Sequence, residues 1–377
     1  MKKICFITAI PASAEAFLKD HMCVLRREYQ VYYVSSEPDP NNIDVSFDGY
    51  HYVDIHRKIS IKNDLKALWH LFHYFRLEKF DAVHSVTPKA GLLTAIAGFF
   101  ARVPVRIHIY TGQVWANKLG VLRFILKFMD RLIALFDNHL LVDGEGQRQF
   151  LIKNKVLKEK KSRVLGSGSI CGVNLERFNP SDAIRNEKRN ELGISDDKTV
   201  FTFMGRLNLD KGLRELLTAF NRLASEKDDV YLLLFGSDEE NISNTFQNYY
   251  AIKDKVNFQY YGRTSEPFNI LQAGDIFVLP TYREGFGSSV IEASALGLPV
   301  ICSDAYGVMD AMIDDVTGLR CKVGDVDSLY DSMFKLATDK DLQKLLGKNG
   351  RERVIREFDG NKVTKNWIDF YNEMLNS

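Results

Sequence analysis

The chain has 377 residues, of which 45% are hydrophobic and 26% charged, and its formal net charge is +1. This length exceeds what one ordinary hydrophobic core holds, and the apolar content excludes a disordered protein, so we expect two globular domains. Its five cysteines form no CxxC pair, which argues against a disulfide framework or a structural zinc site and favours a reducing cytoplasm.

The opening segment, MKKICFITAIPASAE, has the basic start and apolar run of a signal peptide. The apolar run spans only seven residues and stops at Pro11, so we interpret it as a first buried strand. No uninterrupted apolar run along the chain reaches about eighteen residues, and no transmembrane helix is therefore expected.

Short apolar runs recur along the chain, each followed by a longer segment of helical character. Several runs are continuous rather than alternating, as in parallel strands that are covered on both faces. Repeated strand–helix pairs predict doubly wound α/β domains. The runs form a first set, KICFITAI, VYYVSS, DAVHSV, VRIHIYT, HLLVDG and SRVLGSG, and a second set, TVFTFMG, YLLLFGS, VNFQYYG, DIFVLP and PVICSD.

Residues 179–198, NPSDAIRNEKRNELGISDDK, are polar and dense in charge, and we interpret them as a linker. They separate an N-terminal domain, 1–178, from a C-terminal domain, 199–359. A C-terminal helix at about 360–377 can pack back on the first domain. Ligands of doubly wound sheets bind at the carboxyl ends of the strands, so two facing sheets predict a site in the cleft between the domains.

The charge is divided unevenly. Lys and Arg number 29 against 19 Asp and Glu in residues 1–190, and 21 against 30 in residues 191–377. A basic first half suggests an anionic surface or a lipid headgroup as a partner, and no nucleic-acid partner is expected. The alternative is that this asymmetry only aids solubility.

The segment LGVLRFILKFMDRLIALF, residues 119–136, predicts an almost wholly apolar helix. Arg123, Lys127 and Arg131 recur every four residues and therefore share one face. Such a helix can lie on an anionic bilayer with its apolar side in the lipid boundary and its cations at the headgroups. The alternative is a helix docked on the sheet with one basic edge in water.

Residues 166–172, GSGSICG, carry a competing dinucleotide motif. Their glycine spacing is one residue longer than the usual fingerprint, and no long helical pattern follows. A nicotinamide cofactor is therefore not expected, and neither is any other cofactor.

The segment MGRLNLDKG, residues 204–212, directly follows the strand TVFTF. Gly205 permits a tight turn at the end of the strand, so Arg206 and Lys211 project from one loop over the same crevice. A planar guanidinium and a compact ammonium suit a diphosphate. A solvated basic loop is the alternative.

The motif EGFGSSVIE places glycines where a loop must approach a ligand closely, and a helix is predicted to begin at about Ser288. The amides of Gly287, Ser288 and Ser289 would lie at the N-terminus of that helix, which attracts phosphate. Glu284 precedes the helix, so its carboxylate can point at a sugar. Glu292 lies one turn inside, where it either meets the ligand or forms a capping box with Ser289.

Together, GRLNLDKG and EGFGSSVIEASALGLPVICSD resemble the donor-site signature of the retaining nucleotide-sugar glycosyltransferases of family four, which have the GT-B fold. The resemblance extends from the first strand through GVNLERF to TGLRCKVGD, which is nearly the whole chain. It implies that Arg206 and Lys211 hold the donor diphosphate and that Glu284 contacts the transferred sugar. These three are the expected catalytic residues.

The same resemblance implies further donor-binding residues. Glu292 would bind the ribose hydroxyls, and the segment YGRTSE, residues 261–266, lies where the backbone of family members meets the base. The donor-binding residues expected on this basis are Gly205, Arg263, Phe286, Gly287, Ser288 and Glu292.

The acceptor side is expected in the first domain. HSVTPKAGLLTAIAG resembles the family's strand-to-helix segment near the reacting sugar, with Thr87 and Lys89 at the helix entrance. Family members usually carry a Gly-Gly loop after the first strand, whereas this chain has IPASAE, so Ser13 and Ala14 would serve there. Many members place a histidine after the fourth strand, and alignment of RIHIYTGQVW puts Thr111 in that position.

No metal is expected to take part in catalysis. A metal-dependent transferase needs closely spaced carboxylates after a strand. The candidate pair with this spacing, Asp325 and Asp327, is expected to lie in a turn that caps a helix. The two cations of the 204–212 loop and a helix N-terminus can neutralise the leaving diphosphate instead. His84 and His108 are expected to be core or strand-end residues.

The resemblance thus implies a bacterial GT-B enzyme that moves a hexosyl or N-acetylhexosaminyl group from a nucleoside-diphosphate donor, with UDP as the expected nucleotide, and retains its configuration. It also implies cell-envelope polysaccharide synthesis, of the O-antigen or capsule kind, with a glycan acceptor linked to polyprenyl diphosphate. The enzyme would be cytoplasmic and peripheral on the inner face of the cell membrane. The alternatives are another GT-B enzyme, such as a phosphorylase or a sugar-nucleotide epimerase, and a non-catalytic nucleotide-sugar-binding protein.

Overall fold

The computed structural model describes residues 1–56, 59–238, 240–242 and 257–376. The chain divides into two compact units, one formed by Met1–Gly172 with Gly360–Ser377 and the other by Val173–Asp359. Each unit has its own parallel sheet and its own hydrophobic core.

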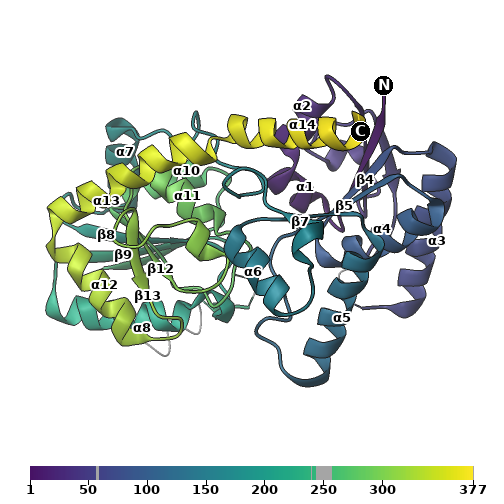
Figure 1. Ribbon diagram of the computed structural model, residues 1–377. Helices are drawn as coiled ribbons and strands as arrows, with labels where there is room; N and C mark the ends of the chain where they lie inside the picture. The colour runs from purple at the N-terminus through teal and green to yellow at the C-terminus, as the bar shows by residue number, and fades with distance from the viewer. Residues whose placement is uncertain (57–58, 239, 243–256, 377) are drawn as a thin grey trace. The chain divides into compact units, whose positions relative to one another are not determined.

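The sheet of the first unit is built from β1 (Lys3–Ile7), β2 (Gln30–Ser35), β3 (Gly49–Tyr52), β4 (Ala82–Val86), β5 (Val105–Tyr110), β6 (His139–Val142) and β7 (Ser162–Arg163). All pairs are parallel, and the described strands follow the order β3-β2-β1-β4-β5-β6-β7 (Figure 1). Every residue of β4 is buried, which is the pattern of a strand that is covered on both faces.

Helices cover both faces of this sheet: α1 (Pro11–Phe17), α2 (Lys19–Leu25), α3 (Ile61–Glu78), α4 (Pro88–Ala101), α5 (Gly120–Phe136), α6 (Glu145–Lys153) and α14 (Gly360–Asn376). Met22 of α2 and Trp367 of α14 belong to one core cluster, whereas Leu71 of α3 and Leu93 of α4 belong to another. The C-terminal helix α14 lies beside α2 (Figure 1) and is part of the first unit.

The sheet of the second unit is built from β8 (Thr199–Met204), β9 (Val230–Phe235), β10 (Phe258–Gly262), β11 (Ile276–Leu279), β12 (Val300–Ser303) and β13 (Gly318–Cys321). These strands are also parallel, in the order β10-β9-β8-β11-β12-β13. Its helices include α7 (Asp182–Leu192), α8 (Leu213–Glu226), α10 (Pro267–Ile270), α11 (Ser288–Ala295), α12 (Val326–Thr338) and α13 (Lys340–Arg353).

The segment expected to be a linker, 179–198, contains helix α7. The side chain of Ser181 caps this helix, and Gly193 ends it in the left-handed region. Arg185 and Arg189 both pair with the Asp275 carboxylate, at 2.6 and 2.7 Å. The polar composition of this segment therefore reflects a surface helix that is tied to the second unit by ion pairs.

Each sheet reverses its strand order once. In the first unit the reversal lies between β1 and β4, and in the second between β8 and β11. Loops that leave the carboxyl ends of two such strands turn in opposite directions, and the crevice between them is where doubly wound folds bind ligands. The predicted fold class, two doubly wound Rossmann-like domains, is confirmed, and it points to these two crevices.

Candidate active site

Two loops of the second unit meet at the carboxyl ends of β8 and β11. The backbone oxygen of Asp210, after β8, accepts hydrogen bonds from the amide of Tyr282 (2.9 Å) and the hydroxyl of Thr281 (3.2 Å). The Asp210 carboxylate pairs with Arg283 at 3.0 Å. The loop after β8 and the loop after β11 are thus joined through both backbone and side chains.

Lys211 and Glu284 form an ion pair across these two loops. Both side chains are largely buried, with 17% and 16% of their surface exposed. Arg206 is exposed near the start of the loop after β8. The structure therefore brings two of the three expected catalytic residues into contact and places the third in the same loop.

Glycines permit the close approach of backbone segments at this edge. Gly212 has a φ of +71°, and a Cβ there would lie 2.0 Å from the backbone oxygen of Pro280. Gly307, after β12, has a φ of +85°, and its Cβ would lie 2.5 Å from the backbone oxygen of Glu284. A side chain at either position would displace the loop that carries Glu284. Gly205 donates its amide hydrogen to the backbone oxygen of Phe235 at 3.1 Å, which fixes the exit from β8.

Helix α11 begins at Ser288, with Gly287 as its N-cap residue at a φ of +91°. Among the described residues no side chain caps this end, so the capping box between Ser289 and Glu292 is not formed. The N-terminus of α11 therefore lies directly after the loop that carries Glu284, with no side chain bonded to its first amides.

Glu292 is partly buried in α11, and burial raises the pKa of its carboxyl to about 7. Within the part of the chain that the structure describes, its carboxylate has neither a hydrogen bond nor an ion pair. A partly buried carboxyl without a partner can accept hydrogen bonds from the hydroxyls of a ligand.

The remaining expected donor residues are placed differently. Phe286 is 2% exposed and packs against Phe358 in the core, so its side chain has a structural role. Arg263 is exposed directly after β10, which lies two strands away from β8. Sequence reasoning missed Asn208, whose buried Oδ1 has no partner among the described residues and which lies between Arg206 and Lys211. Its place inside GRLNLDKG was the available signal.

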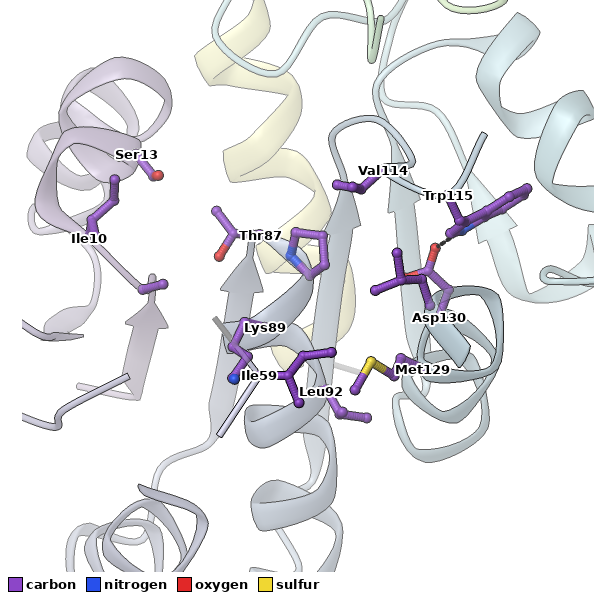
Figure 2. A pocket seen from close by; sticks show the side chains of 13 residues that line it. Ile10, Ser13, Ile59, Thr87, Lys89, Leu92, Val114, Trp115, Met129 and Asp130 are labelled. Atoms are coloured by element: carbon purple, nitrogen blue, oxygen red, sulfur yellow. Dashed lines mark hydrogen bonds between the residues drawn. The ribbon is translucent and has the colours of Figure 1, made fainter. Parts of the chain in front are cut away.

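A cavity of about 370 Å³ lies at the strand-order reversal of the first unit (Figure 2). The expected acceptor residues Ser13, Thr87 and Lys89 all line it. Thr111 does not, although it lies directly after β5 and is partly buried. The cavity is otherwise lined by mainly apolar side chains from the loops after β1 and β5 and from α4 and α5.

Thr87 has an unusual backbone and an unpartnered hydroxyl. Its φ of 79° lies in a region that β-branched residues rarely adopt, and its buried Oγ1 has no hydrogen-bond partner in the described chain. Two residues further, Lys89 pairs with Asp64 at 2.7 Å. The polar side of the cavity thus combines a strained hydroxyl-bearing residue with a paired cation.

Sequence reasoning also missed Asp130, which lines the same cavity from α5. Its side chain is buried, its carboxylate accepts a hydrogen bond from Nε1 of Trp115 at 2.6 Å, and burial raises its pKa to about 7. The available signal was a single acid within the apolar stretch LKFMDRLIAL.

The two histidines near this site belong to the core. Nδ1 of His84 lies 2.6 Å from the hydroxyl of Tyr371, and Nδ1 of His108 lies 2.9 Å from Oγ of Ser85. Burial lowers the pKa of His108 to about 3 and holds the pKa of His84 well below its usual value. Both rings are therefore neutral at physiological pH and structural in role.

The three cations of helix α5, for which the sequence left both lipid headgroups and water open, contact protein groups. Arg123 and Lys127 lie over the ring of Trp115, at 5.6 and 5.2 Å, and Arg131 donates to the backbone oxygen of Lys155 at 3.0 Å. The helix instead exposes six apolar side chains, which we name the apolar face of α5: Val121, Leu122, Phe124, Ile125, Phe128 and Leu135.

Two further features concern membranes and metals. None of the helices in the described ranges combines the length and the apolar content needed to cross a bilayer. Asp325 caps α12 by accepting from the amide of Ser328 at 3.0 Å. The described residues contain no group of three acidic, histidine or cysteine side chains arranged to hold a metal ion.

Two family models match this chain: Glycosyl transferase 4-like domain over residues 23–168 and Glycosyl transferases group 1 over residues 184–353. A capsular polysaccharide biosynthesis glycosyltransferase, CapM, of Staphylococcus aureus is 32% identical over 86% of this chain and 85% of its own length. The UDP-Gal:alpha-D-GlcNAc-diphosphoundecaprenol alpha-1,3-galactosyltransferase of Escherichia coli is 27% identical over 90% of this chain and 87% of its own. An N,N'-diacetylbacillosaminyl-diphospho-undecaprenol alpha-1,3-N-acetylgalactosaminyltransferase of Campylobacter jejuni is 28% identical over 82% of both chains.

Solved structures share the fold at lower identity. Anabaena Alr3699/HepE, in complex with UDP and glucose, superposes with a TM-score of 0.83 at 16% identity and covers 99% of this chain and 100% of its own. WaaG, a glycosyltransferase involved in lipopolysaccharide biosynthesis, superposes with a TM-score of 0.75 at 15% identity, covering 97% and 99%. The chain therefore belongs to the GT-B glycosyltransferases, and its relatives include a capsular polysaccharide enzyme and two transferases named for diphosphoundecaprenol-linked acceptors.

Proposed function

We propose that this chain is a retaining glycosyltransferase of family four that moves a hexosyl or N-acetylhexosaminyl group from a UDP-linked donor to a lipid-linked glycan in cell-envelope polysaccharide synthesis. The observation that carries this proposal is the Lys211–Glu284 ion pair at the β8–β11 reversal, next to the uncapped N-terminus of α11. A cation, an anion and helix amides at one edge of one sheet are the groups that bind a sugar diphosphate.

The donor diphosphate binds to Arg206 and Lys211, with the amides of Gly287 and Ser288 at the start of α11. Negative charge accumulates on the diphosphate as the bond to the sugar breaks. Fixed cations and amide dipoles stabilise that charge more strongly in the transition state than in the bound donor. This arrangement supplies the stabilisation without a metal ion.

The sugar and the nucleoside bind to the two glutamates. Lys211 turns to the phosphate, which releases the Glu284 carboxylate to accept hydrogen bonds from hydroxyls of the transferred sugar. The unpartnered carboxyl of Glu292 accepts the ribose hydroxyls, and Arg263, after β10, lies on the side of the base. Gly205 and Phe286 act through the backbone conformation and packing of the two loops.

The acceptor binds in the first unit, at the cavity that Ser13, Thr87 and Lys89 line, with Thr111 at the end of β5. The names of the Escherichia coli and Campylobacter jejuni relatives describe acceptors that are saccharides on diphosphoundecaprenol. An acceptor of the same class requires the enzyme to work at a membrane surface.

The apolar face of α5 provides the membrane contact. Phe124 and Phe128 are 66% and 48% exposed on adjacent turns, and Leu135 continues the same helix at 67%. Aromatic and aliphatic side chains of this kind enter the boundary between headgroups and acyl chains. Phe99 and Phe100, exposed at the end of α4, pack near Phe136 and lie close to this helix. The enzyme is then peripheral on the inner face of the cell membrane.

A panel of nucleotide sugars tests the proposed donor. Each is incubated with the protein, and release of the free nucleoside diphosphate is measured in the wild type and in Glu284→Gln. We expect release from one or two UDP-sugars and a loss of roughly a hundredfold in the variant, because the sugar contact is removed. Equal release of the nucleoside diphosphate by wild type and variant would show that Glu284 does not contact the transferred sugar.

A further inference from the structure

Asp130 is a buried carboxylate with unused hydrogen-bonding capacity. It is 4% exposed, lines the cavity of the first unit, and has one side-chain hydrogen bond in the described chain, from Nε1 of Trp115 at 2.6 Å. An ionised carboxylate accepts about four hydrogen bonds, and burying one without enough donors is costly. A bond to Trp115 alone needs only one oxygen, which leaves the carboxylate with acceptor capacity for a ligand in the cavity.

None of the cations among the described residues has an ion pair with this carboxylate. Arg123 and Lys127 both lie over the Trp115 ring, but Arg123 donates to the backbone oxygen of Ala116 (3.2 Å) and Lys127 to Oδ1 of Asn154 (3.1 Å). Lys89, on another wall of the cavity, pairs with Asp64. Among the described residues Trp115 is thus the donor to Asp130, and a molecule that enters the cavity can supply a second one.

The cavity is mainly apolar, with polar groups at two separate places in its lining. Figure 2 shows Ser13 and Thr87 across the cavity from Asp130 and Trp115. The buried hydroxyl of Thr87 lacks a partner among the described residues and can bond to a ligand hydroxyl. Around Asp130 the lining is apolar, with Met129 of α5, Leu92 of α4 and Val114 nearby. A ligand that uses both places presents a hydroxyl to Thr87 and Ser13, and a hydrogen-bond donor next to an apolar group to Asp130.

An acetamido sugar has this distribution. Its ring hydroxyls suit Thr87 and Ser13, its amide N–H is a single donor for Asp130, and its methyl group can pack against Met129 and Leu92. A sugar that carries only hydroxyls would leave some of them without partners against the apolar wall. The volume of about 370 Å³ lies in the range of small-molecule sites.

We propose that this cavity binds an acetamido sugar of the acceptor and that Asp130 selects it by accepting the hydrogen bond of the amide N–H. The proposal deepens the proposed function and rests on it, because it names the class of acceptor sugar. Asp130 is a specificity-determining residue that Trp115 holds in position.

The substitution Asp130→Asn provides the sharpest test. Its amide oxygen keeps the bond from Trp115, so its NH₂ group turns to the cavity and a carboxylate acceptor becomes a donor. An acetamido N–H cannot pair with that donor, whereas a sugar hydroxyl can accept from it. Asp137→Asn is the matched control, because Asp137 is a second buried acid at the end of the same helix and does not line the cavity.

Three probes on the same short alkyl diphosphate are compared by calorimetry without donor: an N-acetylglucosaminyl probe, its glucosyl twin, and the alkyl diphosphate alone. We expect wild type and Asp137→Asn to prefer the acetamido probe roughly tenfold over its twin. In Asp130→Asn that preference should disappear or invert. The sugar-free probe should bind more weakly than both sugars to wild type.

Three results would overturn the proposal: equal binding of the acetamido and glucosyl probes by wild type, an unchanged preference in Asp130→Asn, or equally tight binding of the sugar-free probe, which would make the cavity a lipid site. Because binding is measured without a donor, these results are independent of catalysis. Absence of nucleotide release from any sugar donor would instead contradict the proposed function, with the calorimetric comparison still deciding the role of Asp130.

Discussion

The Lys211 ammonium and the Glu284 carboxylate are paired across 73 residues of sequence, and the pair joins the loops after β8 and β11. Each group is the other's ionic partner. In the proposed function, a phosphate that attracts Lys211 would also release Glu284, so diphosphate binding and the sugar contact would be coupled in one pair of residues.

Replacing either diphosphate cation should reduce turnover strongly. Arg206→Ala and Lys211→Ala should each lower kcat by roughly 10² or more, about 3 kcal/mol, because in the proposed function both groups stabilise the charge on the leaving diphosphate. Nucleotide release from the preferred donor measures the effect. Lys348→Ala is the control, since Lys348 is 73% exposed on α13. Activity within threefold of wild type in both site variants would show that Arg206 and Lys211 do not bind the donor diphosphate.

The pKa of Glu292 predicts how donor affinity depends on pH. Burial raises this pKa to about 7, and the ribose hydroxyls of the proposed donor would bind the ionised carboxylate best. Affinity for the UDP-sugar should therefore rise between pH 6 and 8 in the wild type, because donor binding favours loss of the proton. Calorimetry on Glu292→Gln should show weaker binding without this rise. The same pH dependence in the variant would assign the titration to another group.

Asp137 predicts a pH-dependent stability. Both of its carboxyl oxygens are buried without hydrogen-bond partners in the described chain, and burial raises its pKa to about 8, with Arg106 and Lys161 opposing that shift. Between about pH 4, the pKa of an unfolded Asp, and pH 8, the folded protein keeps the proton on Asp137 and the unfolded chain loses it. The free energy of unfolding therefore falls as the pH rises through this range.

Asp137→Asn should remove that dependence. Relative to the wild type, the variant should gain up to about 1.4 kcal/mol of unfolding free energy per pH unit between about pH 5 and 8. Urea unfolding of both proteins across this range measures the difference. If the difference in unfolding free energy between the two proteins did not change with pH, the pKa of Asp137 would be the same in the folded and unfolded states.

Vesicle flotation tests the apolar face of α5. Phe124→Ser with Phe128→Ser should weaken binding to anionic vesicles at least tenfold, because each removes an exposed aromatic ring that is worth on the order of 1–2 kcal/mol when buried in the lipid boundary. Phe334→Ser is the matched control, an exposed phenylalanine on α12 of the second unit. Equal flotation of the α5 double variant and the control would leave this face without a role at the membrane.

The doubly wound fold was predictable because buried parallel strands are continuous apolar runs, as in KICFITAI and YLLLFGS. The strands β3 and β13 were missed, since both lie at sheet edges and are short, with the sequences GYHY and GLRC. The helix α7 was mistaken for a linker because its buried contacts are made by Arg185 and Arg189, and ion pairs leave no apolar pattern in a sequence.

Within the site, the motif spacing indicated that Lys211 and Glu284 belong together, because each lies in a loop that leaves a central strand. Spacing could not reveal that they pair with each other, since that depends on how the two loops pack. The same holds for Asp130, whose significance arises only when α5 places it beside Trp115 in a cavity. The contacts of the α5 cations could not be predicted, because a helical pattern shows which residues share a face but not what that face contacts.

The central claim, metal-independent transfer with retention at the Lys211–Glu284 site, is tested most directly by the product itself. The protein is incubated with its preferred UDP-sugar and an N-acetylglucosaminyl diphosphate lipid in excess EDTA, and the anomeric configuration of the new linkage is determined by NMR. We predict a product that keeps the configuration of the donor and forms at the rate seen without EDTA. An inverted linkage, or complete loss of transfer in EDTA that Mn²⁺ restores, would contradict this account.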